Sequence, residues 1–123
     1  MHKSDKPVQV LIADSQFLIT ESLKIVLNDD GRFTVNKVVT EKSELIHSLK
    51  SGNISALIID PLIIDISSFG ELKEIADSFP NLKLMVISNS ISRKELHELN
   101  NIGVTNIILK TVDKEEIIEA LNA

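Results

Sequence analysis

Five short apolar runs recur along the 123-residue chain, and each is followed by a segment with helical spacing. The runs lie at residues 8–13, 33–39, 56–60, 82–88 and 106–109. Three of them are nearly continuous Val, Ile and Leu, which is typical of strands buried on both faces of a parallel sheet. Five alternations of strand and helix without a repeat predict an α/β domain, a three-layer α/β/α sandwich with right-handed crossovers.

Between the runs, apolar residues recur every three or four positions, as in amphipathic helices. The first such stripe contains Phe17, Leu18, Leu23, Val26 and Leu27. Gly31, Gly52 and Gly103 follow the first, second and fourth helices, where a left-handed cap favours glycine. Ser92, with Glu95 three residues later, predicts a capping box at the start of the fourth helix.

Composition excludes several classes of function. The chain is 43% apolar with a net charge of −5, so it lacks the basic surface that nucleic-acid binding needs. The absence of cysteine excludes disulfides, thiol catalysis and cysteine-ligated zinc, and it suits a cytoplasmic protein. No apolar run is long enough to cross a bilayer, so we expect no membrane segment.

Polar residues stand at the ends of four of the five apolar runs. Asp14 follows the first run and Asp60 ends the third. Ser88 ends the fourth, and Lys110 follows the fifth. In open α/β sheets the carboxyl ends of the strands form the ligand site, so we expect these four residues at one edge. A lysine beside two carboxylates would be held there by charge pairing.

Over essentially its whole length, the chain resembles the response regulator receiver domains of two-component signalling. The segment "IADSQFLITESL" resembles the opening of receivers that carry LuxR/NarL-type helix-turn-helix output domains. "ALIID" matches the family's phosphorylation strand, "LMVIS" its Thr/Ser strand and "IILK" its lysine strand. The resemblance implies a flavodoxin-like (CheY-like), doubly wound (βα)5 fold with a five-stranded parallel sheet in the order 2-1-3-4-5. It also implies a single receiver domain over residues 1–123, with any C-terminal output domain absent from this chain.

The same resemblance implies a chemistry for the polar edge. Asp60 would accept a phosphoryl group from a sensor histidine kinase, a reaction that depends on placement and charge neutralisation. Mg²⁺ would bind Asp14, Asp60 and the backbone carbonyl of Leu62, with water completing its coordination. Lys110 would pair with the phosphoryl oxygens, and the Ser88 hydroxyl would bind the phosphoryl group as the switch.

The resemblance therefore implies a signalling domain and not an enzyme, with at most phosphoryl transfer to itself and autodephosphorylation. No organic cofactor is implied. The expected downstream effect is on transcription, with homodimer formation as the step that phosphorylation biases. Contact with DNA would run only through an output domain.

The clearest departure from the family is Ser15, which stands where the second metal-binding acid is expected. A hydroxyl is neutral, so Ser15 is at best a weak further ligand, and Mg²⁺ affinity should fall by about an order of magnitude or more. A second interpretation, compatible with the first, is that Ser15 caps the first helix.

Other positions at or near the site also differ from the family pattern. Ile107 replaces the family's switch aromatic, Asn89 the small residue after the Thr/Ser, and Thr111 the proline after the lysine. Pro61 removes a backbone donor directly after Asp60.

These departures leave two hypotheses open. Either the chain is a phosphorylatable receiver, or it is a pseudo-receiver, a protein-interaction module that works without phosphorylation. Retention of Asp60, Ser88 and Lys110 favours the first. Asp65, in the loop after the acceptor, is a source of compensating charge if it reaches the site.

Overall fold

The computed structural model describes residues 6–62, 66 and 68–122, which form five strands and five helices. The strands are β1 (Val8–Ala13), β2 (Phe33–Val39), β3 (Ala56–Ile59), β4 (Lys83–Ser88) and β5 (Ile107–Leu109). The helices are α1 (Phe17–Asp30), α2 (Lys42–Lys50), α3 (Phe69–Ser78), α4 (Arg93–Asn101) and α5 (Lys114–Asn122). Each strand agrees with its predicted apolar run to within one residue at either end.

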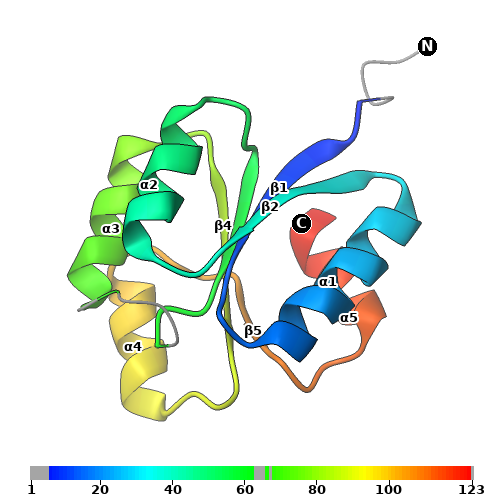
Figure 1. The fold of residues 1–123 in the computed structure, drawn as a ribbon. Helices are drawn as coiled ribbons and strands as arrows, with labels where there is room; N and C mark the ends of the chain where they lie inside the picture. The colour runs from blue at the N-terminus through cyan, green and yellow to red at the C-terminus, as the bar shows by residue number, and fades with distance from the viewer. Residues whose placement is uncertain (1–5, 63–65, 67, 123) are drawn as a thin grey trace.

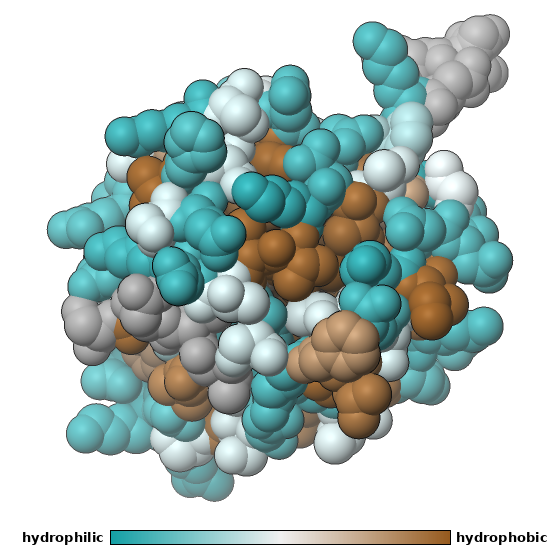
Figure 2. Space-filling model, viewed as in Figure 1, coloured by the Kyte–Doolittle hydropathy of each residue, from teal (hydrophilic) through white to brown (hydrophobic). Residues whose placement is uncertain are grey.

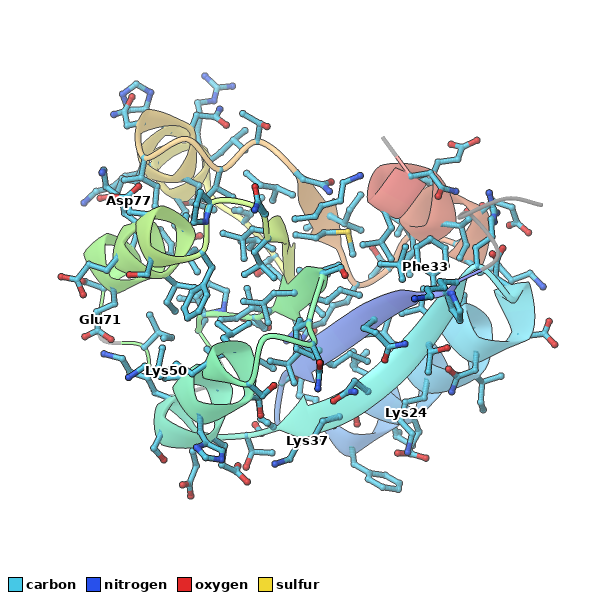
Figure 3. All side chains as sticks on the ribbon, turned by 90° about the horizontal axis from the view of Figure 1, so that it is seen from above. Lys24, Phe33, Lys37, Lys50, Glu71 and Asp77 are labelled. Atoms are coloured by element: carbon cyan, nitrogen blue, oxygen red, sulfur yellow. The ribbon has the colours of Figure 1, made fainter. Side chains whose placement is uncertain are left out.

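The five strands form one parallel sheet in the order β2-β1-β3-β4-β5, which confirms the predicted fold. Helices α1 and α5 cover one face of the sheet, and α2, α3 and α4 cover the other (Figure 1). The view from above separates these three layers, with the edge strand β2 running along α1 (Figure 3). Within the described residues, no helix combines the length and apolarity needed to cross a bilayer.

Successive residues of β1 enter different apolar cores. Leu11 and Ala13 pack with residues of α2, α3 and α4, whereas Val10 and Ile12 pack with residues of α1 and α5. All four are fully buried. Side chains alternate between the two faces of a strand, so a strand covered on both faces must be apolar throughout. This explains the continuous runs in the sequence.

Two predicted helix boundaries are confirmed, at the end of α1 and at the start of α4. Gly31, with φ of 86°, takes the left-handed conformation directly after α1. At the start of α4 the Ser92 hydroxyl accepts from Glu95 N at 3.0 Å, and the Glu95 carboxylate accepts from Ser92 N at 2.9 Å. The two hydrogen bonds are the predicted capping box.

The predicted apolar stripe of α1 is wrong at its first turn. Phe17 and Leu18 are 71% and 78% exposed, and the buried positions are Thr20, Leu23 and Leu27. Thr20 can be buried because its hydroxyl donates to the Phe17 carbonyl at 3.0 Å. Figure 2 shows apolar side chains at the surface in this part of the molecule, among mostly polar neighbours.

Candidate functional site

Main-chain hydrogen bonds of the sheet fix the positions of the polar edge residues. Asp60 N donates to the Ala13 carbonyl at 3.1 Å, one residue beyond the end of β3. Lys110 N donates to the Ser88 carbonyl at 2.8 Å, one residue beyond the end of β5. Asp14, directly after β1, donates its N–H to β2 in the same way. The ladder thus brings Asp14, Asp60, Ser88 and Lys110 to one edge, as the sequence predicts.

The Lys110 ammonium lies between the two carboxylates. Its Nζ is 2.7 Å from Asp14 Oδ2 and 2.7 Å from Asp60 Oδ2. The three side chains are 4%, 0% and 1% exposed. Two carboxylates and one ammonium leave a single net negative charge in a space that water barely reaches. Burying these carboxylates side by side is tolerable only because the lysine compensates them.

Gln16 completes the surroundings of the lysine, and sequence reasoning missed it. Lys110 Nζ donates to Gln16 Oε1 at 2.5 Å, and Asn89 Nδ2 donates to the same oxygen at 3.4 Å. The prediction considered only polar residues at strand ends, and Gln16 lies two positions beyond Asp14, before α1. The signal that could have identified Gln16 is its place in the chain. It is a polar residue between the acid that follows β1 and the first residue of α1.

Ser15 does not cap α1, so that interpretation is wrong. The N-cap position belongs to Gln16, and the helix begins at Phe17. No side chain makes a capping hydrogen bond at the start of α1, and the Asp14 carboxylate instead accepts from the N–H of the N-cap residue, with its Oδ1 2.8 Å from Gln16 N. Ser15 itself is exposed, whereas Asp14 beside it is fully buried. The residue at the family's second acid position therefore lies at the surface, next to the buried Asp14.

The Ser88 hydroxyl already has a hydrogen-bond partner in the main chain. It donates to the Ser90 main-chain carbonyl at 2.6 Å, in the loop between β4 and α4. To bind a group attached to Asp60, Ser88 must release this carbonyl. Ile107, at the position of the family's switch aromatic, is only half-buried.

The loop after β3 restores a donor next to the candidate nucleophile. Pro61 has no N–H and is buried, and the next residue, Leu62, donates its N–H to Asp60 Oδ1 at 3.0 Å. Both Asp60 oxygens are thus engaged, one by Leu62 and one by Lys110. Asp65, the predicted source of extra charge, lies outside the described residues.

The donor set suits a magnesium ion that keeps most of its water. Asp14 Oδ2 is buried, and no hydrogen bond satisfies it within the described residues, although it forms an ion pair with Lys110. Asp60 supplies a second carboxylate beside it. Mg²⁺ is commonly held by one or two carboxylates together with water, so this pair fits the ion. In the described part of the chain, no group of three or more acidic, histidine or cysteine side chains is arranged so that it could hold a metal ion.

Comparison with known families gives one match, which covers most of the chain. The model of the response regulator receiver domain family matches residues 10–122.

Individual relatives agree with this family match. The transcriptional regulatory protein YxjL of Bacillus subtilis is 24% identical over 116 residues, covering 94% of this chain and 53% of the relative. The response regulator protein VraR of Staphylococcus saprophyticus is 24% identical over 118 residues, covering 94% and 55%. The chain thus spans about half the length of these curated relatives. One relative is a transcriptional regulatory protein and the other a response regulator, in agreement with the resemblance to response regulators that the sequence shows.

Among solved structures, the complex of CheX and CheY with BeF3 and Mg²⁺ from Borrelia burgdorferi has a chain of the same fold. It superposes with a TM-score of 0.82 at 19% identity, covering 94% of this chain and 87% of that one.

Proposed function

This chain belongs to the response regulator receiver domain family, and on that premise we propose that Asp60 accepts a phosphoryl group from a sensor histidine kinase. The observation that carries the proposal is the buried triad, in which Lys110 Nζ lies 2.7 Å from both Asp14 and Asp60. Burying charged groups costs free energy unless they are paired, so a buried cluster of three charged side chains favours a functional site. The proposed receiver domain comprises residues 1–123.

In the proposed transfer, an Asp60 carboxylate oxygen attacks the phosphorus of a phosphohistidine. The new O–P bond forms as the P–N bond breaks, and the bonding electron pair returns to the imidazole nitrogen. The transition state spreads negative charge over the phosphoryl oxygens, so stabilisation comes from placed positive charge and hydrogen-bond donors. Lys110 supplies the charge, and the Leu62 N–H holds the acceptor carboxylate in place.

The Ser88 hydroxyl provides the proposed switch. When it turns to bind the phosphoryl group, it leaves the Ser90 carbonyl that it contacts at 2.6 Å. That carbonyl lies two residues before Ser92, the cap of α4. A local change at Asp60 thereby reaches the start of α4, the kind of small bistable rearrangement that switches use.

Asp14, Asp60 and the Leu62 carbonyl would hold Mg²⁺, which when bound neutralises negative charge around the phosphoryl oxygens. Ser15 in place of an acid removes one negative charge from this site. The proposed consequence is Mg²⁺ binding weaker by about an order of magnitude than in a site with the full acidic pair.

The proposed role in the cell is a cytoplasmic switch that controls transcription. Contact with DNA requires an output domain, and the two curated relatives are about twice as long as this chain. Phosphorylation would bias homodimer formation. The domain is proposed to act as a signalling element. Its own chemistry would be limited to phosphoryl transfer to itself and autodephosphorylation.

The test is intact-mass analysis after incubation with acetyl phosphate and Mg²⁺. The wild-type chain should gain one phosphoryl adduct, and Asp60→Asn should gain none. Asp77→Asn is the matched control, because Asp77 lies exposed on α3 and contacts only Lys73 among the described groups. A folded wild-type chain that gains no adduct would favour the second hypothesis, a pseudo-receiver that works through protein contacts alone.

A further inference from the structure

We propose that Gln16 is a positioning residue, a latch that holds the Lys110 ammonium in the resting pocket and must be displaced before phosphoryl oxygens can bind it. An ammonium group has three N–H donors. Three oxygens surround Lys110 Nζ: Asp14 Oδ2 and Asp60 Oδ2 at 2.7 Å, and Gln16 Oε1 at 2.5 Å. An incoming group must therefore compete with three oxygens that already surround the ammonium.

Gln16 is itself held from two sides of the pocket. Its main-chain N–H donates to Asp14 Oδ1 at 2.8 Å, which fixes the residue at the end of β1. Its side-chain oxygen lies 3.4 Å from Asn89 Nδ2, directly after β4. The side-chain oxygen of Gln16 thus contacts both the residue after β4 and the ammonium of Lys110, the residue after β5.

Of the three contacts to Lys110, the one with Gln16 is the contact that an incoming phosphoryl group would replace. Asp14 and Asp60 are charged and buried, so removing Lys110 from either leaves a carboxylate uncompensated. The Gln16 amide is neutral and only half-buried, so it can turn to water at small cost. A phosphoryl oxygen is also the stronger acceptor, because hydrogen bonds between charged groups exceed those to a neutral amide.

The resting-state latch is tested without phosphate, by NMR of the lysine side-chain ammonium groups. In the wild-type chain, Lys110 should give a slowly exchanging ammonium signal, assigned by its loss in Lys110→Met. Gln16→Ala should broaden or remove that signal, and Gln16→Glu, which keeps an acceptor oxygen, should retain it. The control is Gln9→Ala, because Gln9 is the only other glutamine and its side chain contacts Asn36 on β2. An unchanged Lys110 signal in Gln16→Ala overturns the latch.

The displacement step rests on the proposed function and is tested by the rate of phosphoryl uptake from acetyl phosphate, followed by intact mass. Gln16→Ala should take up the group about three- to tenfold faster than wild type, the equivalent of one net hydrogen bond. Gln9→Ala should match wild type. An equal or slower rate in Gln16→Ala shows that Gln16 does not obstruct entry and overturns this step. If neither wild type nor Gln16→Ala gains an adduct, the phosphoacceptor function fails, and the ammonium signal alone decides whether Gln16 holds Lys110.

Discussion

Lys110 Nζ lies 2.7 Å from Asp60 Oδ2, and the same nitrogen lies 2.7 Å from Asp14 Oδ2. One cation therefore compensates two buried carboxylates that come from different strands. Because Lys110 pairs with both buried carboxylates, we expect it to matter for the stability of the fold as well as for the proposed chemistry.

Replacing this lysine should destabilise the fold. In Lys110→Met both carboxylates lose their partner while remaining buried, and breaking a buried ion pair from one side typically costs about 3–5 kcal/mol. We expect a loss of that size in the free energy of unfolding, measured by urea denaturation at neutral pH. Lys73→Met is the control, because Lys73 pairs with Asp77 at 2.8 Å on the exposed surface of α3. That variant should lose less than about 1 kcal/mol. Equal losses in the two variants would contradict the buried pairing.

Restoring an acid at position 15 should strengthen magnesium binding. Ser15→Asp adds one negative charge next to Asp14, and hard-cation sites respond strongly to the number of charged ligands. We expect the dissociation constant for Mg²⁺, from amide NMR titration, to fall by about tenfold.

A control for general charge effects is Ser22→Asp. Ser22 is also exposed and lies seven residues further along the chain, on α1, so the same charge is added on the helix and not next to Asp14. Its dissociation constant should equal that of wild type. A Ser15→Asp variant that binds Mg²⁺ no better than Ser22→Asp would mean that an aspartate at this position does not reach the ion.

The fold was predictable because its signals are local and repeated. Continuous apolar runs indicate strands that are covered on both faces, and the split of Leu11 and Ile12 between two cores shows the reason. The strand order came from the family resemblance, since apolar runs alone do not say which strands are neighbours. The error at Phe17 and Leu18 arose because helical spacing does not reveal that a satisfied hydroxyl, Thr20, can occupy a buried position.

The site was predictable to the extent that strand ends define it. Asp14, Asp60, Ser88 and Lys110 each end or follow an apolar run, so their meeting follows from sheet geometry. Gln16 could not be found in this way, because its contact with Lys110 joins the first loop to the last strand. The orientation of the Ser88 hydroxyl depends on the path of the loop after β4, which apolar patterning does not encode.

The capping box of α4 should contribute measurably to stability. Ser92→Ala removes the acceptor of the Glu95 N–H and should cost about 1 kcal/mol in the free energy of unfolding. Ser68→Ala is a matched control, since Ser68 occupies the N-cap position of α3 but its side chain makes no capping hydrogen bond. Thermal or urea denaturation of both variants checks the difference. A Ser68→Ala loss as large as that of Ser92→Ala would show that serine at these positions acts through something other than the cap.

The hydroxyl of Ser88 should be required for the response of the β4–α4 loop and not for phosphoryl uptake. Ser88→Ala retains Asp60 and Lys110, so we expect it to gain the adduct from acetyl phosphate, measured by intact mass. In wild type, phosphorylation should shift the amide signals of residues 89–92, because Ser88 leaves the Ser90 carbonyl. Ser88→Ala should show little of this shift, whereas Ser90→Ala should retain it, since only the main chain of Ser90 takes part. A full amide response in phosphorylated Ser88→Ala would exclude this hydroxyl as the link, and the signal to α4 would then have to start from Lys110 or from the loop after β3.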